Sequence, residues 1–292
     1  MPNKPQGQLD PHRWIMEGDG LHVSARAIRT EWNLHRREIR GKAPQHPYLK
    51  SYQVSKLYGF PRAAVLLLGY SVEMYLKAGL AKVYRECRSN MFDRDVKGFS
   101  HDYVRLAKAT EFPQEEGDEG NLKLMQDFVL QSSRYPLFPN EKLASNSPDR
   151  FNKINETNGT IWSKEKFSKM LDLAKRIRNH TTSIDQDSQN SCSYSGHLPF
   201  GTDGYLSARS GGRLSPRITF RYSKEMKGEG KATPEAIRAM FASDNWTTAG
   251  RIWDSATLVE DGEKSIVIKG PLEAAPHLKP AKTPKCDNPN QK

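Results

Sequence analysis

The stretch "RAAVLLLGYSVEMYLKAGLAKVYREC", Arg62 to Cys87, decides the fold, because apolar side chains recur along it with a helical period. Such a broad apolar surface predicts burial on more than one side, as in the central helix of a bundle or a helix against another subunit. Pro61 suits its first turn. One apolar stripe holds Val65, Leu68, Val72, Leu76, Gly79 and Val83, and a neighbouring stripe holds Leu66, Tyr70, Leu80 and Tyr84.

Shorter segments around this helix also have helical patterns. We expect a flexible arm over 1–20, a helix capped by Ser24 that continues to Arg40, and a last helix capped by Ser163. Two segments lack a helical pattern, and we expect a loop over 91–100 and an acidic flexible segment over 111–120. Further helices are predicted over 101–110, 121–135 and 163–180.

The composition changes after Thr181, where a Ser-, Gly- and Asp-rich stretch without any period begins. Beyond it, "RITFRYS" alternates like a strand, "PEAIRAMFAS" resembles a short helix, and "TLVEDGEKSIVIKG" predicts a β-hairpin. The predicted fold class is therefore mainly α, a helical bundle followed by a linker and a small α+β segment. The expected divisions are an N-terminal arm and helix over 1–45, a helical domain over 46–185, a linker or mobile loop over 186–215, the α+β segment over 216–270 and a disordered basic tail over 271–292.

Charge and cysteine content narrow the class of protein. The net charge of the 292 residues is +11, which attracts polyanions such as RNA, although spread-out lysines and arginines also simply solubilise a surface. The three cysteines are far apart, so we expect neither a disulfide framework nor a metal site, and no cofactor motif is present. The polar N-terminus is no signal peptide, and the longest apolar run is too short to span a membrane, so a cytoplasmic protein is expected.

Candidate catalytic residues lie at the end of the last predicted helix, in "LDLAKRIRNHTTSID". Arg176 and His180 are four residues apart and therefore neighbours at the margin of its apolar face. RNA hydrolysis without a metal could use such a pair, because the histidine can move the ribose 2′-hydroxyl proton while the arginine holds the phosphate. The alternative is a basic helix end favoured by the helix dipole alone.

A second charged pair lies within the apolar helix. Glu73 and Lys77 are also four apart, so they either form a structural ion pair or support the first site, Glu73 as an orienting group and Lys77 as a phosphate contact. His101-Asp102 is best interpreted as helix capping. The stretch "RSGGRLSPR" from Arg209 could hold a phosphate, but a flexible loop is the simpler interpretation.

Four motifs together resemble the HEPN-domain family. They are "AAVLLLGYSVEMYLKAGL", "FSHDYVRLAK", "SRYP" at 133–136 and the helix that carries Arg176 and His180, and the resemblance covers about residues 45–185. It implies a helical bundle that dimerises and brings two signature helices to one cleft. Many members are metal-independent endoribonucleases of toxin–antitoxin or antiphage systems that leave 2′,3′-cyclic phosphates, and others bind RNA, nucleotides or partner proteins without cutting.

The resemblance assigns His180 as the catalytic histidine and Arg176 as the arginine. The family signature has four to six residues between them, whereas three separate them here. We therefore hypothesise a homodimeric RNA endonuclease with Arg178 and Asn179 as accessory groups, Glu73 and Lys77 as support, and no metal or cofactor. The alternative is an inert module of the same kind that binds nucleic acid or a protein, with residues 216–270 as a possible partner-binding addition.

Overall fold

The protein folds into two compact units in a computed structural model. The first unit comprises Met1–Lys82 with Asp93–Ser183, and the second comprises Val83–Phe92 with Ile184–Lys292. The predicted class, mainly α with a small α+β segment, is confirmed. The structure describes residues 9–40, 47–85, 87, 89–132, 159, 161–186, 189, 191–242, 244–260 and 266–269.

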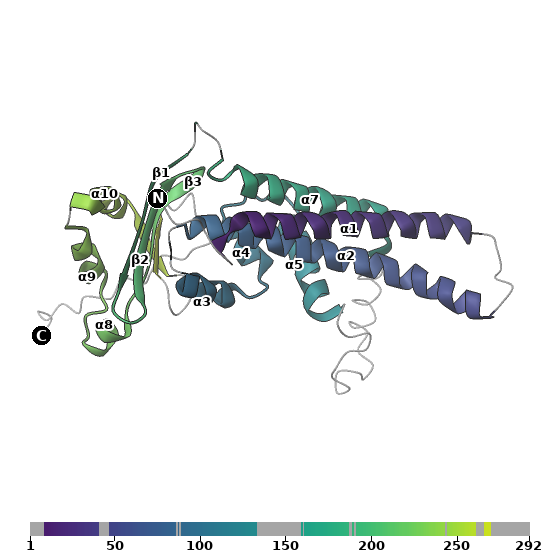
Figure 1. Ribbon diagram of the computed structural model, residues 1–292, viewed down its shortest axis with the longest axis horizontal. Coiled ribbons are helices and arrows are strands. Elements are labelled where there is room, and N and C mark those ends of the chain that lie inside the picture. Colours follow the sequence, from purple (N-terminus) through teal and green to yellow (C-terminus); the bar gives the residue numbers. More distant parts are fainter. Residues whose placement is uncertain are drawn as a thin grey trace, which may run out of the picture. The chain divides into compact units, whose positions relative to one another are not determined.

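Three long helices run alongside one another in the first unit (Figure 1). They are α1 (Pro11–Glu38), α2 (Pro47–Val83) and α7 (Lys164–Ser183), and the shorter elements are α4 (Tyr103–Ala109), α5 (Asp118–Asp127) and a π-helical turn, η2 (Phe128–Ser132). Helix α3 (Ser89–Phe99) is divided between the two units after Phe92.

Helix α1 begins much earlier than the sequence predicts. Asp10 caps it by accepting a hydrogen bond from the His12 backbone N–H, with Pro11 in the first turn. Ser24 lies inside the helix and donates to the Gly20 carbonyl, so the expected Ser24 cap and the flexible arm up to residue 20 are wrong from residue 11 onward. Residues 11–20 are mostly polar, so their helical pattern is weak and their composition resembles that of a flexible arm. The structure also places this helix in the bundle rather than in a separate 1–45 segment.

Helix α2 is the core helix that its apolar stripes predict. Val65, Leu68, Val72 and Leu76 are fully buried, while Pro61 lies inside the helix instead of at its start. Its segment Ser51–Val83 is long and apolar enough to cross a membrane, but 67% of its most apolar window is buried within the protein. A core helix of a folded bundle meets the same test.

Two predicted loops contain helices. Residues 91–100, expected to be a loop, belong mostly to α3, and the acidic segment 111–120 ends in the first turn of α5. Phe92 and Val96 are buried, so tertiary packing supports α3 despite its many charges. The predicted cap of α7 is confirmed, because Ser163 Oγ accepts a hydrogen bond from the Lys166 backbone N–H. "SRYP" and the Arg-Tyr-Pro turn lie outside the described residues.

The second unit contains a five-stranded antiparallel sheet with the order β1-β2-β3-β5-β4. The predicted linker over 186–215 is wrong, because β1 and β2 occupy it. Their serines, glycines and prolines hide the alternation, although Leu206 and Ala208 of β2 are buried and Leu198 and Phe200 of β1 pack against the same core. The strands are β1 (Cys192–Phe200), β2 (Gly204–Gly211), β3 (Leu214–Arg221), β4 (Thr257–Glu260) and β5 (Ile266–Lys269).

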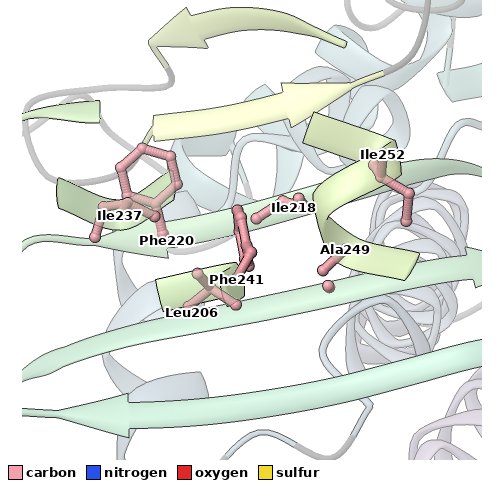
Figure 2. Packing of buried hydrophobic residues seen from close by; sticks show 8 residues of the cluster. Leu206, Ile218, Phe220, Ile237, Phe241, Ala249 and Ile252 are labelled. Atoms are coloured by element: carbon pink, nitrogen blue, oxygen red, sulfur yellow. The ribbon is translucent and has the colours of Figure 1, made fainter. Parts of the chain in front are cut away.

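Short helices cover one face of this sheet and close its core. Figure 2 shows Leu206, Ile218 and Phe220 from the strands packed against side chains of these helices. The predicted helix near Pro234 and the hairpin of β4 and β5 are confirmed, while its turn at 261–262 and the tail 271–292 lie outside the described residues. The helices are α8 (Lys224–Gly228), α9 (Pro234–Ala239), η5 (Met240–Ala242), η6 (Asp244–Trp246) and α10 (Thr247–Asp254).

Candidate functional site on helix α7

Helix α7 is anchored at both ends, which fixes the direction of its polar side chains. Ser163 caps its start, and at its end the Lys82 ammonium donates to the Thr181 and Thr182 carbonyls over 2.7 and 3.1 Å. A cation at a helix C-terminus satisfies carbonyls that lack partners within the helix and complements its dipole. The predicted packing face is confirmed as buried, with Phe167, Met170, Leu173, Ala174 and Ile177.

Arg176 and His180 share one site, as their four-residue spacing predicts. Both side chains lie against the ring of Phe112. The His180 ring meets it edge-on with centroids 5.7 Å apart, and the Arg176 guanidinium lies 5.6 Å from its centroid. The site is partly open, because a third of the Arg176 side chain remains exposed.

Two carboxylates already hold Arg176. Its guanidinium donates to Asp118 over 2.5 Å and lies 3.2 Å from Glu115. The hydrogen bond to Asp118 raises the pKa of Arg176, although partial burial opposes this. Asp118 is itself buried and accepts from the Glu115 backbone N–H, so the acidic segment before α5 folds around this arginine. Any phosphate at Arg176 must therefore compete with a fixed acidic partner.

His180 is oriented by the end of helix α4. Its Nε2 lies 2.9 Å from the carbonyl oxygen of Thr110, and because a carbonyl only accepts, this nitrogen carries the hydrogen. Thr110 is fully buried where α2 and α7 meet, and it packs beside Gly79. The neutral imidazole is thereby held in one tautomer, with Nδ1 as its basic nitrogen.

Arg178 and Asn179 point to other sides of α7. Arg178 forms a two-pronged ion pair with Asp19 of α1, with Nε and Nη2 at 2.5 and 2.7 Å. The Tyr75 hydroxyl donates to the same carboxylate over 2.8 Å. Arg178 therefore links α7 to α1 and α2, whereas Asn179 is exposed.

Glu73 and Lys77 belong to a separate buried network. The Glu73 carboxylate, 2% exposed, accepts from the Lys77 ammonium at 2.6 Å, from Nδ1 of His101 at 3.0 Å and from the Tyr103 hydroxyl at 3.3 Å. Burial raises the pKa of Tyr103, and the neighbouring Glu73 charge raises it further. The imidazole that Glu73 orients is thus His101, at the opposite end of α4 from Thr110.

Sequence reasoning missed several partners in these sites. His101 follows a cap signal, and Asp102 does cap α4, which concealed the role of the histidine side chain. Asp118 and Phe112 lie in a stretch interpreted as flexible. The only sequence signal for the pairing of Arg176 with Asp118 is that an acidic segment and a basic helix end occur in the same chain.

The glycine-rich stretch "RSGGRLSPR" forms the β2–β3 turn. Gly211 and Gly212 adopt positive φ values of 86° and 68°, which favour glycine. Arg209 is buried and paired with Asp185, so it is not placed to hold a phosphate. Within the described part of the chain, no group of three or more histidine, cysteine or acidic residues is arranged to bind a metal ion.

Comparisons of the whole chain with protein-family models, with characterised proteins and with solved structures find no match.

Proposed function

We propose that the helical unit is a metal-independent endoribonuclease that uses His180 as its acid–base group and Arg176 as its phosphate ligand. The observation that carries the proposal is that both side chains contact the same ring, that of Phe112. The reaction needs a proton acceptor and a cation that binds phosphate. The half-buried His180 imidazole, with its fixed tautomer, supplies the first, and the neighbouring Arg176 guanidinium supplies the second.

The proposed reaction needs no metal or cofactor. Nδ1 of His180 accepts the proton of a ribose 2′-hydroxyl, and the 2′-oxygen attacks the adjacent phosphorus. The bond from phosphorus to the 5′-oxygen breaks, that oxygen takes a proton from a water molecule, and the His180 imidazolium returns its own proton to the solvent. The products are a 2′,3′-cyclic phosphate and a free 5′-hydroxyl. Arg176 offsets the charge that develops on the phosphoryl oxygens, after exchanging Asp118 or Glu115 for the phosphate.

A second candidate function is RNA binding without cleavage. The carboxylates that neutralise Arg176 favour it, because a guanidinium paired with Asp118 attracts phosphate weakly. Both candidates agree with the net charge of +11. In either case two copies of the chain are proposed to pair, which sedimentation analysis would measure.

The test is incubation of the purified chain with labelled single-stranded RNA in EDTA. We expect cleavage that is lost in His180→Ala and Arg176→Ala and retained in Lys175→Ala, which changes an exposed neighbour on the same helix. A substrate with a single 2′-deoxy nucleotide should resist cutting at that position. Cleavage that survives in His180→Ala, or no cleavage despite RNA binding, would overturn the nuclease and leave the binding module.

A further inference from the structure

A pocket of about 710 Å³ lies where the end of α1, the first half of α2 and the segment before α7 meet. This volume falls in the range of small-ligand sites. The site on α7 contributes none of the lining. The residues that line the pocket are Trp32, Asn33, Arg36, Arg37, Ile39, Arg40, Leu57, Tyr58 and Trp162.

Two exposed aromatic rings form one wall of the pocket. Tyr58 is 53% exposed and Trp162 is 40% exposed, and their ring centroids are 5.2 Å apart at an angle of 54°. Large aromatic side chains are seldom left this open, and an exposed pair gives a flat base a surface on which to stack.

A buried arginine holds this wall in place. Arg29, 5% exposed, donates to the carbonyls of Ile161, Trp162 and Ser163 at 2.6, 3.1 and 3.1 Å. Burial, together with the nearby Arg36, lowers the pKa of Arg29 to about 10, so it stays protonated at neutral pH. The backbone at Trp162 is thereby fixed before any ligand arrives, which limits the entropy lost on binding.

Another part of the pocket lining is strongly cationic. Arg36, Arg37 and Arg40 are exposed at the C-terminal end of α1, and Arg36 lies over the Trp32 ring at 5.3 Å. None of the three forms an ion pair with another residue in the described part of the chain. Among the residues that the structure describes, the lining contains three guanidinium groups and no carboxylate, so this part of the pocket favours an anionic ligand.

We propose that this pocket binds single-stranded RNA, with bases stacked on Tyr58 and Trp162 and successive phosphates on Arg36, Arg37 and Arg40. The proposal rests on the proposed function only in taking RNA as the ligand. Bases must be unstacked to reach aromatic rings, which favours a single strand over a duplex. A nucleoside triphosphate is the poorer fit, because its magnesium ion would find no carboxylate among the described residues of the lining.

The experiment measures binding of a fluorescent single-stranded RNA by anisotropy, in a His180→Ala background that cannot cut it. We expect Tyr58→Ala and Trp162→Ala each to weaken binding by about tenfold. Tyr52→Ala is the matched control, because Tyr52 is also 53% exposed on α2 but lies outside the pocket lining. It should leave affinity unchanged.

Salt dependence tests the cationic part of the lining separately. Replacing Arg37 or Arg40 by glutamine should lower the slope of log affinity against log salt by about 0.7 for each phosphate that the protein no longer neutralises. Arg26→Gln is the control, since Arg26 is exposed on α1 nearer its N-terminus and does not line the pocket. An equal reduction of the slope in Arg26→Gln would indicate nonspecific charge attraction and overturn the site.

Three further results would also overturn the proposal: unchanged binding in Trp162→Ala, equal affinity for the annealed duplex, or displacement of the RNA by micromolar magnesium–ATP. Pocket-dependent binding by a protein that shows no cleavage leaves this inference intact and removes only the nuclease. Cleavage that the pocket variants leave unaffected at subsaturating RNA does the reverse, because it removes this inference and leaves the α7 site standing.

Discussion

His101 donates its Nδ1 hydrogen to the buried carboxylate of Glu73 over 3.0 Å, joining the start of helix α4 to the middle of α2. The same carboxylate also binds Lys77 and Tyr103. A carboxylate this buried is stable only while these groups donate hydrogen bonds to it, and removing it leaves the buried donors without an acceptor.

The first prediction concerns Glu73→Gln. Removing one partner of a buried charge network leaves Lys77 and His101 without compensation, so the free energy of unfolding should fall by about 3 kcal/mol. Urea denaturation followed by circular dichroism measures it. The matched control is Glu165→Gln, which breaks an ion pair of the same spacing with Lys169 on an exposed surface and should leave the free energy of unfolding almost unchanged. Equal reductions in the two variants would show that the Glu73 network is not a stabilising one.

The second prediction concerns pH and the Asp19–Arg178 pair. The hydrogen bond from Arg178 lowers the pKa of Asp19 from its ordinary value of 3.8, and Tyr75 adds to the effect. A depressed carboxyl pKa stabilises the fold above the unfolded value, and this contribution is lost as the pH falls through the folded value. Because Asp19 is partly exposed, the contribution is reduced by solvent screening.

Asp19→Asn should therefore lower the urea midpoint at pH 7, and the difference from the parent chain should shrink steadily below about pH 4. Urea titrations from neutral pH down to about pH 2.5 would check this. A difference that stays constant over this range contradicts the ion pair as its cause.

The third prediction concerns Asp118→Asn, which removes the main charge paired with Arg176. If Arg176 contacts phosphate, freeing it should tighten RNA binding about threefold at moderate salt, while the thermal midpoint falls. Asp172→Asn is the control, because Asp172 is exposed on the same helix. Lower stability without any gain in RNA affinity would mean that Arg176 serves the fold alone.

The fourth prediction uses two glycines of α2. A Cβ at Gly79 would lie 2.8 Å from Thr110 Cγ2 and 3.3 Å from Thr181 Oγ1, so Gly79→Ala should destabilise the bundle by about 1–3 kcal/mol. A Cβ at Gly59 would meet no neighbouring atom within 4 Å, so Gly59→Ala should stabilise the helix by about 0.5–1 kcal/mol. Thermal unfolding of both variants measures this difference in sign.

Gly79→Ala also bears on the α7 site. The carbonyl of Thr110 orients the His180 ring, so a displacement of Thr110 should change the orientation and hydrogen bonding of the imidazole. The NMR chemical shifts of the His180 ring should differ from those of the parent chain, and Gly59→Ala should leave them unchanged. Identical shifts in all three proteins would mean that the crossing of α2 and α7 does not set the histidine environment.

Much of the bundle was determined by local patterns in the sequence. The apolar period of α2, the Ser163 cap and the packing face of α7 each follow from contacts between residues three or four apart, which a helix brings together regardless of the rest of the chain. The proximity of Arg176 to His180 is of the same kind, so it too was predictable.

Only the tertiary structure decided what those side chains touch. Asp118 reaches Arg176 across 58 residues and Asp19 reaches Arg178 across 159, and no sequence period encodes such pairs. The strands at 192–211 were missed for a related reason: a strand is stabilised by its neighbours in the sheet rather than by its own residues, so serines and glycines suffice there. Long-range pairing therefore determined the partners of the charged groups, and short-range periodicity determined where the helices form.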